Sequence, residues 1–199
     1  MRIMVTTLAL IGSFAGFAFA QNGGSQSGPP VLAKQIDTPR GGTSALLVTS
    51  DAIRLGQPLD DRYTQNGENM SPALGWSRGP AGTQSFVILA EDGSVNQREP
   101  ISHWVVYDLP STMTRITTNQ PATAKLDSGG MQGLNVRKAV GFIGPKPPAG
   151  QTHTYHFEVF ALNTHLNLDP DKTDRDAVVS AMKGHVLASG DFVTNYTGK

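Results

Sequence analysis

The order of apolar and polar residues predicts a domain built mainly from β-strands. Four segments combine apolar and β-branched residues over the length of a strand: Ser44–Ser50, Gln84–Glu91, Ile101–Leu109 and His153–Leu162. Turn residues such as Asn66-Gly67, Gly129-Gly130 and Gly144-Pro145 separate these runs. Short strands at such intervals favour an antiparallel β-sandwich or a related fold.

Within the last of these segments, the residues alternate between two faces. Side chains two positions apart on a strand share a face. One face is therefore expected to carry Tyr155, Phe157, Val159 and Ala161, and the other His156, Glu158 and Phe160.

One helix is predicted near the C-terminus. Thr173 is the expected N-cap, with Asp176 as a weak capping-box partner. The apolar face repeats at helical spacing and includes His185, which is expected to be a packed core histidine. Gly190 is expected just beyond the end of the helix. The positions of this face are Val178, Ala181, Met182 and His185.

The N-terminal region is not expected to belong to the domain. Arg2 precedes a long apolar run that ends in Ala18-Phe19-Ala20, which predicts a secretory signal peptide over residues 1–20. A membrane anchor is the alternative, but the run is short and interrupted by glycine and serine. Residues 21–43 are expected to form a flexible leader, because Gln21–Pro30 has almost no apolar content. The protein is thus expected to be exported, periplasmic or secreted, with one domain over residues 44–199.

Composition narrows the possible partners. The 199 residues contain no cysteine, so an apolar core must hold the exported domain without disulfides. Lys plus Arg and Asp plus Glu number 16 each, and removal of Arg2 leaves 15 against 16, a net charge of −1. Such a chain has no long-range attraction for nucleic acid or an acidic membrane surface. The oligomeric state is not predicted.

The segment from Gly144 to Tyr155 carries the candidate chemistry. A loop rich in proline and glycine leads directly into a strand on which His153 and Tyr155 share a face. Both side chains can donate hydrogen bonds, and a histidine near neutral pH can carry positive charge. Prolines fix the loop before a ligand arrives, and Gly144 is expected to let the backbone approach that ligand closely. This combination suits a small anion such as phosphate.

Several ordered segments then resemble a known family. Asn69–Trp76 reads Asn-x-Ser-Pro-x-Leu-x-Trp, and His103–Pro110 reads His-Trp-Val-Val-Tyr-x-Leu-Pro. Gly133-x-Asn135, the proline loop and His153-x-Tyr155 follow in order. From about Ser44 to the C-terminus, the chain resembles bacterial members of the phosphatidylethanolamine-binding protein family, also called the Raf kinase inhibitor protein family.

The resemblance implies a mainly β fold, an antiparallel Greek-key β-sandwich with a C-terminal helix. It also implies a small pocket for phosphate-like anions and the phosphoethanolamine head group. In this pocket Asp92 would orient an imidazole or meet an ammonium. The implied pocket residues are Asp92, His103, Gly144, Pro145, His153 and Tyr155.

The chain departs from the family pattern at three positions. Ser94 stands where the family motif has a second aspartate, and both prolines of that motif are missing, so the loop is expected to be softer and one negative charge poorer. Lys146 stands where a cysteine is common in bacterial relatives, and Thr154 replaces the arginine of His-Arg-Tyr. The anion site is expected to survive with weaker recognition of an amine.

Other functions find less support in the residues. Asp92, His103 and His153 have side chains of the kinds that bind metal ions. The chain, however, lacks a compact ligand pair and a His-Glu-x-x-His motif. It also lacks a nucleophile elbow, a phosphate-binding Gly-x-x-x-x-Gly-Lys loop and a Rossmann glycine pattern. The sequence therefore favours a non-enzymatic binding protein without metal or cofactor. The alternative is an inhibitor that acts on a protease or kinase through the pocket rim.

Overall fold

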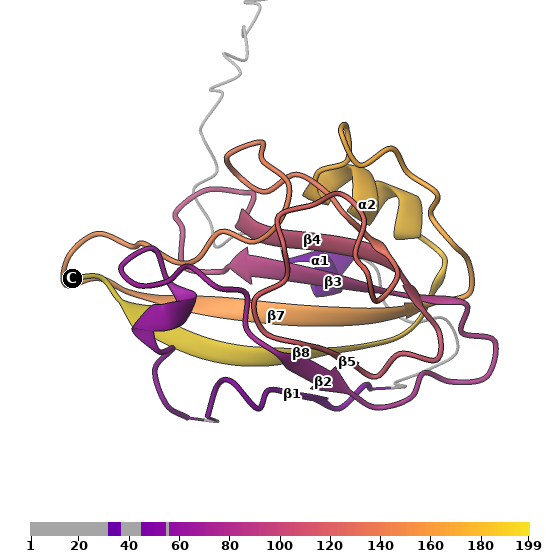
Figure 1. Cartoon of the computed structure of the whole chain (residues 1–199), viewed down its shortest axis with the longest axis horizontal. Coiled ribbons are helices and arrows are strands. Elements are labelled where there is room, and N and C mark those ends of the chain that lie inside the picture. Colours follow the sequence, from indigo (N-terminus) through magenta and orange to yellow (C-terminus); the bar gives the residue numbers. More distant parts are fainter. Residues whose placement is uncertain (1–31, 37–44, 55) are drawn as a thin grey trace, which may run out of the picture.

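The computed structural model describes residues 32–36, 45–54 and 56–199. The predicted signal peptide lies outside these residues, and so does most of the predicted leader. The elements of the described part (Figure 1) are the helices α1 (Ala33–Ile36), η1 (Asp61–Tyr63, a 3-10 turn) and α2 (Arg175–Met182), and the strands β1 (Val48–Thr49), β2 (Leu74–Trp76), β3 (Ser85–Asp92), β4 (Ile101–Pro110), β5 (Arg115–Ile116), β6 (Met131–Gln132), β7 (Thr152–Leu162) and β8 (Val186–Thr197).

The strands form two antiparallel sheets, one of five strands in the order β6-β4-β3-β7-β8 and one of three in the order β1-β2-β5. The apolar run of β3 lies in the middle of the larger sheet, and all eight of its residues are buried. The prediction of a mainly β, antiparallel fold with few helices is confirmed. The Greek-key connectivity stays a prediction.

The alternation along β7 separates two apolar cores. Tyr155, Phe157 and Val159 pack with residues of the smaller sheet, such as Trp76. Phe160 points to the opposite face and packs with the helices. The expected division of β7 into two faces is thus confirmed, and the larger sheet has one face covered by strands and the other by helices.

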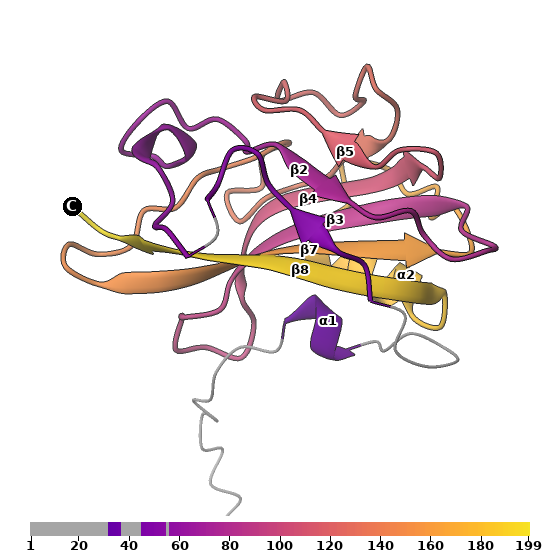
Figure 2. The same cartoon turned by 90° about the horizontal axis from the view of Figure 1, so that it is seen from below.

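The helix-covered face carries both α1 and α2. Val178, Val179 and Met182 of α2 are buried there with Ala33 of α1. Figure 2 shows β1 and β2 on one side of β7 and β8 and α1 on the other side. Residues 32–36 belong to the predicted leader, yet Leu32 and Ala33 are buried. The packed part of the chain thus includes residues before the expected boundary at residue 44.

Two details of the predicted helix are wrong. The N-cap is Asp174, whose side chain accepts the backbone N–H of Ala177, whereas the hydroxyl of Thr173 donates to the carbonyl of Asp169. The helix ends at Met182, because Gly184 adopts a φ of 76°, a left-handed conformation that glycine accepts readily.

The residues after this turn form strand β8, so two further expectations fail. Gly190 lies within β8 and does not end the helix. His185 is exposed, and its Nδ1 atom contacts the side-chain oxygen of Asn163 at 2.9 Å, so it is no core residue. Pairing with β7 along almost the whole of β8 determines its strand conformation. Among the described residues, no helix has the length and apolar character needed to span a membrane.

Candidate functional site

Three strand ends meet at one end of the larger sheet. Asp92, the last residue of β3, pairs with Ile101 at the start of β4 and with Tyr155 near the start of β7. In Figure 1 the arrowhead of β3 points to the end at which β4 and β7 begin. A cavity of about 300 Å³ opens there, a volume that suits a small ligand. It is lined by Gln65, Asp92, Ile101, His103, Val136, Arg137, Ile143, Lys146, Pro147, Pro148, His153 and Tyr155.

Asp92 and His153 form a close pair in the wall of this cavity. The Nδ1 atom of His153 lies 2.7 Å from Oδ2 of Asp92, and since a carboxylate only accepts, Nδ1 carries the hydrogen. The other oxygen of Asp92 accepts the backbone N–H of Ser94 at 2.9 Å. The Nε2 atom of His153 has no hydrogen-bond partner among the described residues. A protonated imidazole would therefore donate one hydrogen to Asp92 and the other to an anion in the cavity.

Tyr155 lies between the two histidines of the site. Its ring stacks on His153 with centroids 6.4 Å apart, and it meets His103 edge-on at 5.4 Å. The prediction that His153 and Tyr155 share one face is confirmed. Burial, then the negative charge of Asp92 and a side-chain hydrogen-bond interaction with the same carboxylate, raise the pKa of the Tyr155 phenol, so it stays protonated and acts as a donor within the site.

His103 contributes an acceptor to the site. Its Nδ1 atom lies 2.7 Å from the backbone oxygen of Ile143, so Nδ1 is the donor. Burial lowers the pKa of His103 and favours the neutral imidazole, although the carbonyl of Ile143 opposes this shift. The Nε2 atom is buried and has no partner among the described residues. It can therefore accept a hydrogen bond from a ligand hydroxyl or a protonated phosphate oxygen.

The structure brings Asp92, His103, His153 and Tyr155 together around the cavity. The other two predicted residues, Gly144 and Pro145, are buried and are not among the residues that line the cavity. The N–H of Gly144 donates to Oδ1 of Asn69 at 2.7 Å. A Cβ atom at Gly144 would lie 2.5 Å from the backbone oxygen of Tyr63. Glycine is therefore required here by backbone packing, and close approach of this backbone to a ligand stays a prediction.

Three polar side chains of the cavity come from outside the predicted set. Nothing in the sequence pattern singles out Gln65 or Arg137, and Lys146 stands out only as a departure from the family loop. Arg137 follows the Gly133-x-Asn135 segment, which is the one signal that could have indicated it. The guanidinium of Arg137 donates to Oε1 of Gln65 at 2.6 Å. Arg137 and Lys146 add positive charge to the lining, and Gln65 adds an uncharged amide.

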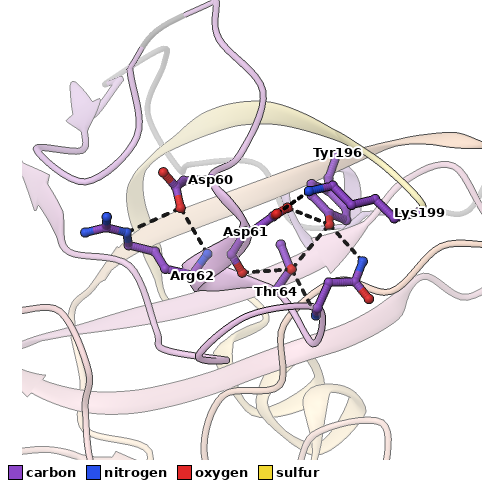
Figure 3. Close-up of polar contacts among 7 residues, drawn as sticks. Asp60, Asp61, Arg62, Thr64, Tyr196 and Lys199 are labelled. Atoms are coloured by element: carbon purple, nitrogen blue, oxygen red, sulfur yellow. Dashed lines mark hydrogen bonds and ion pairs between the residues drawn. The ribbon is translucent and has the colours of Figure 1, made fainter.

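A polar cluster fixes the loop that supplies Gln65 (Figure 3). The hydroxyl of Tyr196, near the end of β8, donates to Asp61 at 2.9 Å, and Lys199 forms an ion pair with the same carboxylate. Beyond η1, the amide of Gln65 donates to the backbone oxygen of Gly144 at 2.6 Å. The end of β8 is thus connected through the η1 loop to the cavity.

The part of the chain that the structure describes has no group of three or more His, Asp or Glu side chains placed to hold a metal ion. The cavity instead presents hydrogen-bond donors and cations around one paired carboxylate.

Comparison with known proteins agrees with this fold. A family model described as phosphatidylethanolamine-binding protein matches residues 49–197. The chain therefore belongs to the phosphatidylethanolamine-binding protein family, and the resemblance found in the sequence is confirmed.

Individual relatives come from bacteria and archaea. The chain is 36% identical over 138 residues to a UPF0098 protein of Methanothermobacter thermautotrophicus. The matched region covers 69% of this chain and 89% of the relative. The crystal structure of Escherichia coli YbcL, described as a member of the mammalian PEBP family, matches with a TM-score of 0.70 at 28% identity, over 78% of this chain and 100% of that one. A PEBP homolog of Chlamydia trachomatis matches with a TM-score of 0.67 at 28% identity, over 79% of this chain and 100% of that one.

Proposed function

We propose that this protein is a non-enzymatic binding protein whose cavity takes a small phosphate-bearing ligand, such as the head group of a phospholipid. The Asp92–His153 pair at 2.7 Å carries this proposal. Asp92 fixes the orientation of the imidazole, and Nε2 is left for a ligand. Tyr155 adds a neutral donor, and Arg137 and Lys146 add positive charge at the same cavity. Charge-assisted hydrogen bonds from such groups are the usual means of holding phosphate.

We also propose that the protein is exported and works in the periplasm or outside the cell. The apolar run after Arg2 and the Ala18-Phe19-Ala20 sequence support this proposal. It places the cavity where lipid head groups and soluble phosphate esters are both accessible.

Replacement of His153 by Ala tests the binding proposal. The variant loses a donor and a potential positive charge. The free energy of phosphate binding, measured by calorimetry, should therefore become less favourable by about 1–3 kcal/mol. His185→Ala is the matched control, because His185 is exposed and does not line the cavity; its phosphate affinity should equal that of the wild type. Unaltered phosphate affinity in His153→Ala would exclude this site. Turnover of generic phosphate or carboxylic esters by the wild type would contradict the proposal that the protein is not an enzyme.

A further inference from the structure

We infer that this cavity selects phosphate monoesters that lack an amine over zwitterionic phosphoethanolamine-type ligands. The inference rests on the proposed phosphate-binding function and specifies the class of ligand. It follows from the charges that line the cavity and from the contacts that already occupy its only carboxylate among the described residues.

The carboxylate of Asp92 is shielded from an ammonium group, and each of its oxygens already has a partner. The residue is only 2% exposed. One oxygen lies 2.7 Å from Nδ1 of His153, and the other accepts the N–H of Ser94 at 2.9 Å. The hydroxyl of Ser94 accepts the N–H of Thr154 at 2.7 Å, so it is bound to the β7 backbone. An amine in the cavity would therefore meet only a buried carboxylate whose two oxygens are already hydrogen-bonded.

Arg137 is held at the rim by a structured turn. The side-chain oxygen of the buried residue Asn135 accepts the N–H of Arg137 at 2.9 Å. One guanidinium N–H donates to Gln65, and Arg137 forms no ion pair with any described residue. Since a guanidinium has five N–H groups, several remain for a ligand. Arg137 is thus a positioned cation with unused donors.

Lys146 supplies a second cation from another segment of the lining, the proline loop. It is exposed and stands between Pro145 and Pro147, whose rings restrict the backbone on both sides. Its ammonium group forms no ion pair with the described residues. Apart from the two imidazoles, the lining carries two cations against one carboxylate, a formal charge of +1. This excess favours a ligand with two negative charges and repels a ligand ammonium.

Propyl phosphate and phosphoethanolamine test the inference directly, because they have nearly the same shape and differ in a terminal methyl or ammonium group. Titration calorimetry at low salt should show that the wild type binds propyl phosphate about tenfold more tightly, a difference of about 1.4 kcal/mol. Lys146→Met and Arg137→Met should each reduce this preference to less than about threefold and weaken binding of both compounds.

Lys138→Met is the matched control. Lys138 follows Arg137 in the chain and is exposed, but it pairs with Asp174 at 2.9 Å and does not line the cavity. This variant should keep the wild-type preference. Equal binding of both compounds by the wild type, or a preference that persists in both cavity variants, overturns the inference and leaves the proposed function intact. A wild type that binds neither compound overturns the proposed function itself.

Discussion

At the scale of single residues, the least expected feature is a pair of buried carboxyl groups on the helix-covered face. Glu91 and Glu158 are both fully buried. Glu91 has two partners: Nε of Arg175 at 2.6 Å and the backbone N–H of Ala33 at 2.9 Å. Burial, followed by the charge of Glu91, raises the pKa of Glu158 to about 9. The protein therefore keeps Glu158 protonated at neutral pH.

This pKa gives stability a defined dependence on pH. The ordinary pKa of such a group is 4.5, so between about 4.5 and 9 the native state holds a proton that the unfolded state releases. Rising pH within this window therefore favours unfolding, and the slope flattens above pH 9. Glu158→Gln cannot release that proton. From pH 5 to pH 8, the unfolding free energy of the variant should rise relative to the wild type by on the order of 1–3 kcal/mol.

Urea unfolding at several pH values measures this difference. Glu99→Gln, at an exposed glutamate, should give a pH profile parallel to that of the wild type. Parallel profiles for Glu158→Gln and wild type would show that Glu158 is ionised in the native protein.

At the scale of elements, the end of β8 supports the cavity from behind. Tyr196 is buried, donates to Asp61 and accepts the side-chain amide of Asn66 at 2.8 Å. Lys199 adds an ion pair to Asp61, but both partners are exposed, and exposed pairs contribute little. The hydroxyl of Tyr196 therefore links β8 to the η1 loop that carries Gln65, beside the backbone hydrogen bond from Leu59 to Asn195 at 2.8 Å.

Tyr196→Phe should loosen this loop while preserving the packing of the ring. Loss of the hydroxyl should cost about 1 kcal/mol of stability and weaken phosphate binding by roughly threefold, because Gln65 is less well held. Thermal unfolding and calorimetry check the two effects. Lys199→Met serves as the control, and its stability and phosphate affinity should equal those of the wild type within experimental error. Wild-type phosphate affinity in Tyr196→Phe would show that this polar cluster does not influence binding in the cavity.

At the scale of the whole molecule, β8 also joins the two sheets. The backbone N–H of Leu46, just before β1, donates to the carbonyl of Ser189 in β8 at 2.9 Å. The two segments approach so closely that a Cβ atom at Gly190 would lie 2.0 Å from the backbone oxygen of Leu46. A position that was expected to end a helix thus determines how the smaller sheet attaches to the larger one.

Gly190→Ala should force these backbones apart and destabilise the protein by on the order of 1–3 kcal/mol, as overpacking does elsewhere. Chemical denaturation provides the measurement. Ser189→Ala is the neighbouring control, which adds no atom to the contact and should change stability by less than about 0.5 kcal/mol. Wild-type stability in Gly190→Ala would mean that the segment before β1 moves freely relative to β8.

The sequence by itself determined the features that depend on local pattern or on family motifs. The alternation along β7 placed His153 and Tyr155 on one face, because side-chain direction in a strand has a period of two residues. The continuous apolar run of β3 predicted a buried strand. The ordered motifs added Asp92 and His103, and all four side chains line the cavity.

Tertiary structure alone decided the remaining features. Asp92 and His153 are 61 residues apart, and only the register of β3 against β7 brings them together. Arg137 and Gln65 meet across 72 residues of chain, and no local periodicity marks either of them. Pairing with β7 makes β8 a strand where the sequence pattern suggested the end of a helix. Such features depend on which segments become neighbours, and hydrogen bonding between distant strands determines this, whereas local side-chain pattern does not.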